Sequence, residues 1–391
     1  FFADPPYIRI SDKETKDVLS FVNLEKGKEI NVMVMNDSAP KTAFILNRGE
    51  YDQPTDSVLP NTPATIHPFS KDLPQNRLGL AKWVTDEKNP LTARVFVNRI
   101  WGMVFGRGLV ETSEDFGVQG SLPTHPELLD WLAVDFMENN WDIKYLLKKI
   151  MLSATYQQSS ELTPELKVAD SENKLLARAP RFRMSGEMIR DYILASSGLL
   201  NREIGGPSVK PYQPPGLWEE TNAGGNRGIL TTYVPDEGEK LYRRSLYTFW
   251  KRTLPPANMT IFDAPTRDFC EVRRQKTNTP LQALALQNDV QVLEAARVLA
   301  QNIVTEKGSP KDMVNNVFRA ILVREPKVDE LELLETYYTN AWEDFNDDQE
   351  NAEKLITQGS YASTDADPIK TAALMLTAQV IYNLDETITK E

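Results

Sequence analysis

The chain has 391 residues, of which 41% are apolar, and its 44 basic against 56 acidic residues give a net charge of −12. This balance argues against nucleic-acid binding, which needs a basic surface. No apolar run reaches the roughly 20 residues of a membrane-spanning helix. The single cysteine, Cys270, excludes an internal disulfide, a Cys-rich zinc site and a haem attachment of the C-x-x-C-H type. The length predicts two or three domains.

The first part of the chain is predicted to contain strands. Segments 29–35 and 42–48 are rich in β-branched residues and flank a turn-like segment, 36–41, so they predict an antiparallel strand pair. Four prolines follow between residues 54 and 68. Because proline cannot donate to a strand ladder, we expect an extended linker or strap over those residues.

From residue 74 the apolar residues recur with helical spacing. In a first helical block, residues 74–200, helices are predicted within 78–84, 92–105, 126–136, 145–152 and 183–200. Thr124 and Glu127, with Pro126 between them, predict a capping box where the third of these helices begins.

A second helical block covers residues 279–391. Thr279 as N-cap and Pro280 at the first helical position predict a helix start, and the apolar spacing continues this helix to Leu299. Further helices are predicted within 314–322, 330–342 and 369–384.

Residues 201–278, between the two blocks, are rich in glycine and proline and predict a long irregular segment with short strands at 229–233 and 245–250. The predicted fold class is therefore mainly α. It combines a multi-helix, bundle-like body with a small antiparallel β element near the N-terminus and the irregular central segment.

The strongest local charge anomaly is the arginine-rich segment, residues 243–276, which has eight Lys and Arg against three Asp and Glu, interleaved with aromatic residues. Guanidinium forks bind carboxylate, sulfate or phosphate and stack on aromatic rings. The predicted ligand-binding residues are Arg243, Arg244, Arg252, Arg273, Arg274 and Trp250. The alternative is that these arginines are paired inside the protein, because irregular backbone needs side-chain hydrogen bonds.

Histidine is scarce, with His67 and His125 alone, and no spacing in the sequence predicts a metal site. His125 lies beside a predicted helix start and could act as a general acid or base with Glu114 and Asp115. The alternative is a structural histidine next to a tight helix connection. Cys270, which has no histidine near it in the sequence, is expected to be a buried small hydrophobe.

Several strings, in order along the chain, resemble the family of the domain of unknown function 1553, found in large extracytoplasmic proteins of planctomycetes and related bacteria. The strings are Asn89–Trp101, Phe105–Val110, Asp115–Gly117, His125–Ala133, Gly205–Ser208, Tyr242–Tyr247, Phe262–Pro265, Arg273–Leu284 and Asn383–Glu386. The resemblance covers about residues 75–390, so residues 74–391 are expected to form one family domain.

In that family the domain usually follows a c-type cytochrome segment and another uncharacterised domain. The resemblance therefore implies export, and it implies that residues 1–73 are a β-containing junction or the tail of a preceding domain of a longer precursor. No cofactor is expected in this chain, and haem c is expected only on a linked domain or a partner cytochrome.

The leading hypothesis is a non-haem module of an extracytoplasmic, cytochrome-associated protein. It would bind a partner or an anionic ligand, such as a sulfated or uronic polysaccharide, through the arginine-rich segment. One alternative is a carbohydrate-active enzyme that uses His125, Glu114 and Asp115 as acid and base. The other alternative is a structural scaffold in which all of these side chains are paired internally.

Overall fold

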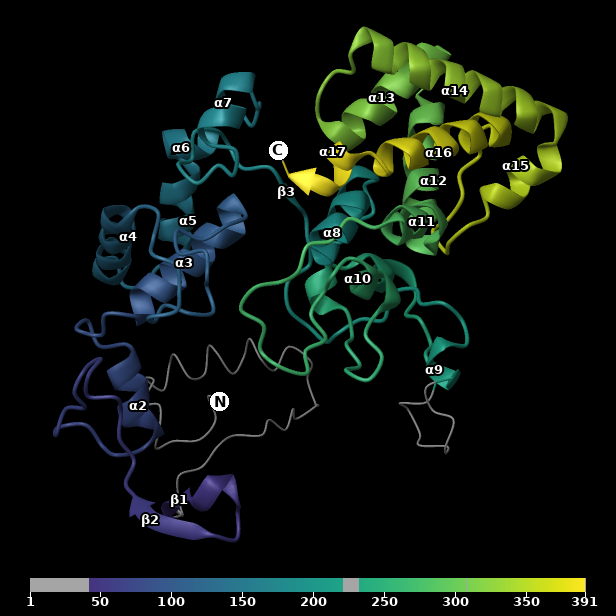
Figure 1. The fold of residues 1–391 in the computed structure, drawn as a ribbon. Coiled ribbons are helices and arrows are strands. Elements are labelled where there is room, and N and C mark those ends of the chain that lie inside the picture. Colours follow the sequence, from purple (N-terminus) through teal and green to yellow (C-terminus); the bar gives the residue numbers. More distant parts are fainter. Residues whose placement is uncertain (1–41, 221–231, 307, 391) are drawn as a thin grey trace, which may run out of the picture. The chain divides into compact units, whose positions relative to one another are not determined.

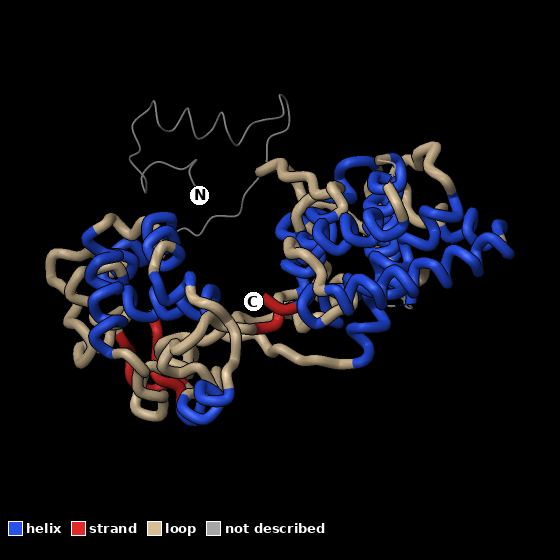
Figure 2. The backbone as a smooth tube through the Cα atoms, turned by 90° about the horizontal axis from the view of Figure 1, so that it is seen from above, coloured by secondary structure: helices blue, strands red, loops and turns tan. Residues whose placement is uncertain are grey.

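The computed structural model describes residues 42–220, 232–306 and 308–390 (Figure 1). About 50% of the described residues are helical, and the strands are short (Figure 2), which confirms the predicted fold class. The chain divides into two compact units. The first contains residues 42–100 and 125–148 of the described chain, and the second contains residues 101–124 and 149–390. The four segments predicted from the sequence stay a prediction.

The first unit begins with a small hairpin. Strand β1 (Ala43–Leu46) pairs antiparallel with β2 (Pro54–Val58), and a 3-10 turn, η1 (Asn47–Gly49), follows β1. The strand predicted at 42–48 is thus present, whereas its predicted partner, 29–35, lies outside the described residues. Its partner in the structure is the start of the stretch predicted to be a linker. That prediction was wrong for Pro54–Val58, because a proline at the first position of a strand removes no interior ladder bond.

Three predicted helices occur in the first unit as α2 (Arg77–Val84), α4 (Pro126–Glu138) and the N-terminal part of α3 (Thr92–Phe105). The rings of Phe96 on α3 and Phe136 on α4 stack with centroids 5.2 Å apart. The predicted capping box was wrong: His125 is the N-cap of α4 and makes no side-chain cap bond. Thr124 instead donates its hydroxyl to the carbonyl of Leu109, at 3.3 Å.

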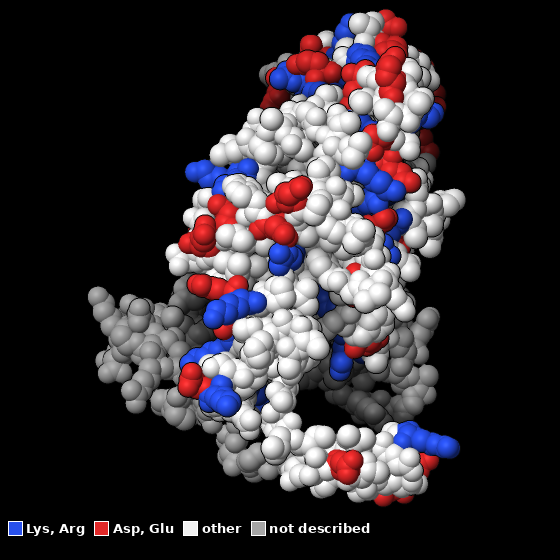
Figure 3. Space-filling view, turned by 60° about the vertical axis from the view of Figure 1, so that its left-hand side comes forward, with Lys and Arg blue, Asp and Glu red and all other residues white. Residues whose placement is uncertain are grey.

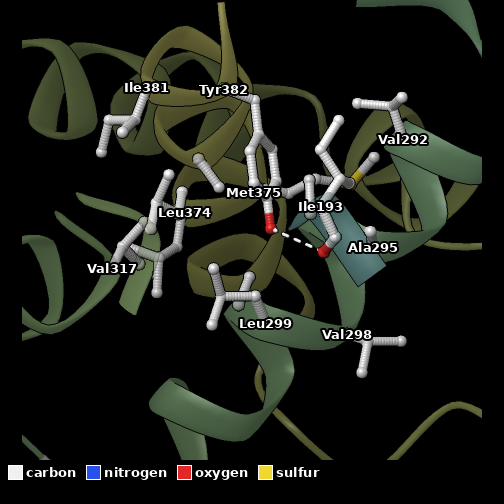
Figure 4. Packing of buried hydrophobic residues seen from close by; sticks show 14 of the residues in the cluster. Ile193, Val292, Ala295, Val298, Leu299, Val317, Leu374, Met375, Ile381 and Tyr382 are labelled. Carbon is white, nitrogen blue, oxygen red and sulfur yellow. Dashed lines mark hydrogen bonds between the residues drawn. The ribbon is translucent and has the colours of Figure 1, made fainter. Parts of the chain in front are cut away.

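The core of the second unit is formed by α12 (Val290–Thr305) and α16 (Pro368–Tyr382), which lie side by side (Figure 1). Against them pack α8 (Gly186–Ser196), α13 (Pro310–Leu322) and α14 (Val328–Asp347). Tyr382 sits among aliphatic side chains of this core (Figure 4) and is fully buried. Its hydroxyl lies 2.8 Å from the Ser196 hydroxyl, as a buried phenol requires.

The remaining elements are shorter or complete the helical blocks. They are α5 (Ile143–Met151), α6 (Ala154–Gln157), α7 (Pro164–Ala169), α9 (Leu217–Glu220), η3 (Gly238–Tyr242), η4 (Ser245–Tyr247), α10 (Ala257–Ile261), α11 (Pro280–Asn288), α15 (Gln349–Leu355) and α17 (Asp385–Ile388). A second two-stranded sheet pairs β3 (Phe182–Arg183) antiparallel with β4 (Thr389–Lys390).

Two predictions in the second unit need correction. The helix expected to continue from 280 to 299 breaks at Asp289, which has extended backbone and caps α12 by accepting from the amides of Gln291 and Val292. The strand predicted at 245–250 is absent, because Ser245 begins the turn η4 and donates both its amide and its hydroxyl to Asp191, each at 2.7 Å. Of the strand predicted at 229–233, residues 229–231 lie outside the described residues and the last two are irregular.

Within the described ranges, none of the helices combines the length and the apolar character that crossing a bilayer requires.

Candidate functional site

Arg243, the first predicted ligand-binding arginine, is buried and holds the irregular segment together. Only 4% of it is exposed. Its guanidinium donates to the carbonyls of Pro207, at 3.2 Å, and of Glu203 and Gly205, and it stacks 3.9 Å from the centroid of the Tyr247 ring. These contacts fit the alternative in which the arginine is paired inside the protein.

Arg190 on α8, which the sequence did not single out, serves the same segment. Its Nε donates to Gln291 Oε1 at 2.6 Å, and its Nη1 and Nη2 donate to the carbonyls of Arg243 and Leu241 at 2.9 and 2.8 Å. Burial lowers the pKa of this guanidinium to about 10. Hydrogen bonds from two buried arginines to its carbonyls therefore help to order this irregular backbone.

Arg273 and Arg274 are exposed and each meets a carboxylate. Arg273 lies 3.4 Å from Glu114, and both side chains are largely exposed. Arg274 Nη1 donates to Glu187 Oε2 at 2.7 Å, and this pair helps to lower the pKa of the Glu187 carboxyl against the opposing effect of burial. The two arginines bind different carboxylates, so the described contacts do not show them holding one common ligand.

The other predicted binding residues are Trp250, Arg244 and Arg252. The Trp250 indole donates to the carbonyl of Thr266 at 3.1 Å, and the guanidinium of Arg267 lies 4.2 Å from the indole centroid. Arg244 and Arg252 are exposed. On the face shown in Figure 3, Lys and Arg lie interspersed with Asp and Glu.

The predicted acid and base groups belong to different units. Glu114 and Asp115 lie in the second unit and His125 in the first. Asp115 accepts a hydrogen bond from the Gly117 amide at 2.6 Å, which is the geometry of a turn-forming aspartate. The combination of His125 with these carboxylates stays a prediction. Among the described residues, no group of three or more His, Cys, Asp or Glu side chains is placed to hold a metal ion.

The prediction for Cys270 was wrong, because its side chain is exposed. It lies in a run, Thr266–Cys270, in which every residue is exposed. Cysteine is usually buried in proteins, but a surface segment of irregular backbone offers a small apolar side chain nothing to pack against. The average burial of a residue type therefore does not predict the exposure of Cys270.

A cleft of about 280 Å³ in the second unit brings together side chains that are distant in the sequence. Its lining includes four cationic side chains, Arg107, Lys174, Arg178 and Arg181, and three aromatic ones, Trp101, Phe105 and Phe182. The lining contains one carboxylate, that of Glu172. The cleft is thus cationic and aromatic, although the whole chain is acidic.

One wall of the cleft depends on Gly106, directly after α3. Its φ of +76° is in the left-handed region that favours glycine at a helix end. A Cβ atom at this position would lie 2.7 Å from Cδ1 of Phe182. Glycine is therefore needed at this position for two reasons: the left-handed backbone conformation and the close approach of the Phe182 ring.

The 170–178 loop also lines the cleft and is held by its own side chains. Asp170 accepts from the amides of Lys174 and Leu175, at 2.7 and 2.9 Å. Asn173 donates to the carbonyl of Arg178 at 2.9 Å and accepts from its amide at 3.2 Å. Leu176 has a φ of 58°, a strained conformation for a residue with a Cβ. Such strain is concentrated at functional sites, because the surrounding bonds must maintain it.

The ion pairs of the cleft lining centre on Glu172. Its Oε2 lies 2.8 Å from Lys174 Nζ and 3.2 Å from Arg107 Nη1. Lys174, and after it Arg107, hold the pKa of the Glu172 carboxyl below its usual range. Arg107 also pairs with Glu111 through Nη2, while its buried Nε has no hydrogen-bond partner among the described residues.

Sequence reasoning missed this cleft, although signals were present. Arg107 stands in the string Phe105–Val110, which carried part of the family resemblance. Asp170 and Asn173 are turn-forming residue types, and they frame Glu172. The string did not reveal which distant residues would face Arg107.

A family model described as a protein of unknown function (DUF1553) matches residues 76–338. This match includes Arg107, the 170–178 loop and the arginine-rich segment. No curated protein and no solved structure matches the chain.

Proposed function

Because this chain belongs to the DUF1553 family of proteins of unknown function, we propose a binding role for it, as a non-haem module of an extracytoplasmic, cytochrome-associated protein. Its ligand is anionic and binds in the cleft beside Arg107. Export and the association with a c-type cytochrome rest on the family resemblance, with haem c on a linked domain or a partner.

The observation that carries the proposal is the composition of the cleft lining, four cationic side chains and three aromatic rings against one carboxylate. Arg178 donates to backbone carbonyls and Arg181 pairs with Asp385, so Arg107 and Lys174 are the cations that would meet the ligand. Guanidinium and ammonium groups recognise carboxylate and sulfate by charge-assisted hydrogen bonds, and aromatic walls suit the apolar face of a ring. The volume of about 280 Å³ is near the lower end of ligand pockets, roughly 300–1,000 Å³. A single acidic or sulfated sugar unit is therefore a better fit than a long stretch of polymer.

Calorimetric titration with sulfated, uronic and neutral sugars of the same ring type tests the proposal. We expect binding of the anionic sugars alone, and a loss of affinity of about tenfold or more for Arg107→Gln, because a hydrogen bond to a charged group is removed. Arg319→Gln is the matched control, since Arg319 is exposed and pairs with exposed Glu325 at 3.2 Å. Equal affinity for neutral and anionic sugars, or no effect of Arg107→Gln, would contradict the proposal.

The arginine-rich segment is the alternative surface for the same ligand. Its exposed members Arg244 and Arg252 can be replaced together by glutamine without touching the buried bonds of Arg243. If this double variant loses binding while Arg107→Gln keeps it, the ligand binds the segment and not the cleft.

The association with a cytochrome has its own test. The native protein is purified and its visible absorption spectrum is recorded together with the masses of all subunits. A Soret band that co-purifies with the chain supports the association, and a haem-free protein of a single mass contradicts it.

A further inference from the structure

Glu172 stands where an anionic ligand would be expected to bind. It is the one carboxylate of the cleft lining, and a single one of its oxygens, Oε2, meets both Lys174 and Arg107. We propose that Glu172 is a built-in competitor: its carboxylate occupies the anion subsite between Arg107 and Lys174, and the carboxylate or sulfate of the ligand displaces it. This inference rests on the proposed function of the cleft.

The displacement costs little at Glu172 itself. Its side chain is 61% exposed, and so is much of the Lys174 side chain, at 46%. Exposed ion pairs are weak because water screens both charges and hydrates them when they separate. When the Glu172 side chain rotates into solvent, water therefore hydrates both its carboxylate and the Lys174 ammonium, and the incoming anion takes over the contact with Arg107 Nη1.

The backbone that carries Glu172 does not depend on the Glu172 side chain. The bonds that shape the 170–178 loop are made by Asp170, Asn173 and Arg178. Arg178 adds two more, from Nη1 to the carbonyl of Asp170 at 2.8 Å and from Nη2 to that of Ser171 at 2.9 Å. The loop can thus keep its shape when the carboxylate leaves.

Arg107 also keeps its position after the exchange. Its side chain is only 25% exposed, and Nη2 remains bound to Glu111, which does not line the cleft. The guanidinium then presents Nη1 to the incoming anion, as it presented it to Glu172. The subsite is therefore preorganised, which lowers the cost of binding.

Only an anionic ligand uses this subsite. A neutral ring that enters the cleft gains no ion pair and leaves Glu172 bound to its two cations. An anion replaces the contacts that it disrupts. The competitor thus lowers the apparent affinity for every anion and raises the ligand concentration at which the subsite fills.

The test compares the wild type, Glu172→Gln and Glu325→Gln by calorimetric titration with sodium sulfate and with one sulfated monosaccharide. Sulfate keeps its charge throughout, so the ligand does not titrate. We expect Glu172→Gln to bind both probes about two- to fivefold more tightly, the range that an exposed ion pair can supply. Glu325→Gln removes an equally exposed partner of an arginine, Arg319, and is expected to bind as the wild type does.

The outcomes separate the inference from the proposed function. If the wild type binds and Glu172→Gln binds equally or more weakly, Glu172 is no competitor, while the anion-binding function stands. If neither binds, both are overturned. Far-UV circular dichroism of each variant checks that the fold is intact, and Glu172→Ala, which also removes the hydrogen-bonding amide, must tighten binding as Glu172→Gln does.

Discussion

Arginine has opposite roles in two regions of the second unit. Arg243 in the irregular segment and Arg190 on α8, which packs against that segment, are buried and donate mainly to its backbone carbonyls. In the cleft, Arg107 is partly exposed and pairs with the side chains of Glu111 and Glu172. A carbonyl in a packed segment cannot move away, whereas an exposed carboxylate can rotate into water.

The kind of partner therefore decides what an arginine can do. A guanidinium that is saturated by backbone carbonyls is a structural cross-link, and removing it leaves buried acceptors without donors. A guanidinium that faces an exposed carboxylate remains available to another anion. A high density of arginine in a sequence does not distinguish these two cases, but substitutions at the individual positions do.

The largest effect is expected from Arg190→Met, which keeps the bulk of the side chain and removes its donors. Breaking a buried polar network by removing one charged partner costs about 3–5 kcal/mol. Urea unfolding followed by circular dichroism measures the loss, with Arg319→Met as the exposed control. If both variants lose the same small free energy of unfolding, Arg190 is not a structural cross-link.

Gly106→Ala is expected to come next, at about 2–3 kcal/mol, because the new methyl group must displace the Phe182 ring. Gly198 has a similar φ of +81°, and no atom of the described residues lies within 4 Å of the place that a methyl group would take there. Gly198→Ala should therefore cost only the backbone strain, about 1 kcal/mol. The same urea titration measures both, and the Gly106 variant should also bind the anionic sugar more weakly. If the two variants lost the same free energy of unfolding, the contact with the Phe182 ring would not be what requires glycine at position 106.

A smaller effect concerns pH and a third kind of arginine site. Arg324 pairs with Glu330 and Glu386 at 2.8 and 2.7 Å and holds the pKa of Glu330 at about 2. Because the folded-state pKa is lowered, this stabilisation is present above the unfolded value of 4.5 and is lost as the pH falls towards 2. These side chains are still about one-third exposed, so water screens part of the interaction and we expect about 1 kcal/mol.

Unfolding midpoints of the wild type and Arg324→Gln at several pH values between 6 and 2 check this expectation. The difference between the two should be largest at neutral pH and should shrink below about pH 4.5. A difference that does not change with pH would mean that Arg324 stabilises the fold by packing and not by charge.

The smallest effect is expected for Arg273→Gln. Its partner Glu114 is 46% exposed and Arg273 itself is 61% exposed, so the free energy of unfolding should change by less than about 0.5 kcal/mol. Thermal unfolding is sufficient to measure it, with Arg190→Met on the same scale. If Arg273→Gln lost as much free energy of unfolding as Arg190→Met, Arg273 would be a structural cross-link like the buried arginines.

The helical blocks could be predicted from the sequence because their signals are local. The start of α11 at Pro280 is indicated by residues within one turn of it. The apolar face of α13 is indicated by the spacing of apolar residues within that helix. The break at Asp289 was missed because the apolar spacing runs through it without interruption. The Asp289 side chain caps α12 at this position and ends the continuous helix, and a pattern of apolar residues contains no information on capping.

The candidate site could not be predicted because its members are distant in the sequence. Arg107 and Glu172 are 65 positions apart, and nothing near either residue specifies the other. Arg243 was predicted to bind a ligand, and its internal pairing was the alternative that the sequence left open. The anion site was predicted in the arginine-rich segment because charge density is visible in a sequence, whereas burial and the kind of partner are not.

The pairing of β3 with β4 has a consequence for biosynthesis. Phe182 forms part of the cleft and is also the strand partner of Lys390, while the neighbouring Arg181 contacts Asp385, 204 positions further along the chain. A nascent polypeptide cannot close this contact until residues 385–390 have left the ribosome, and such distant pairings form slowly. The helical core also needs α16 and Ile388, so the core and this wall of the cleft depend on the same late segment of the second unit.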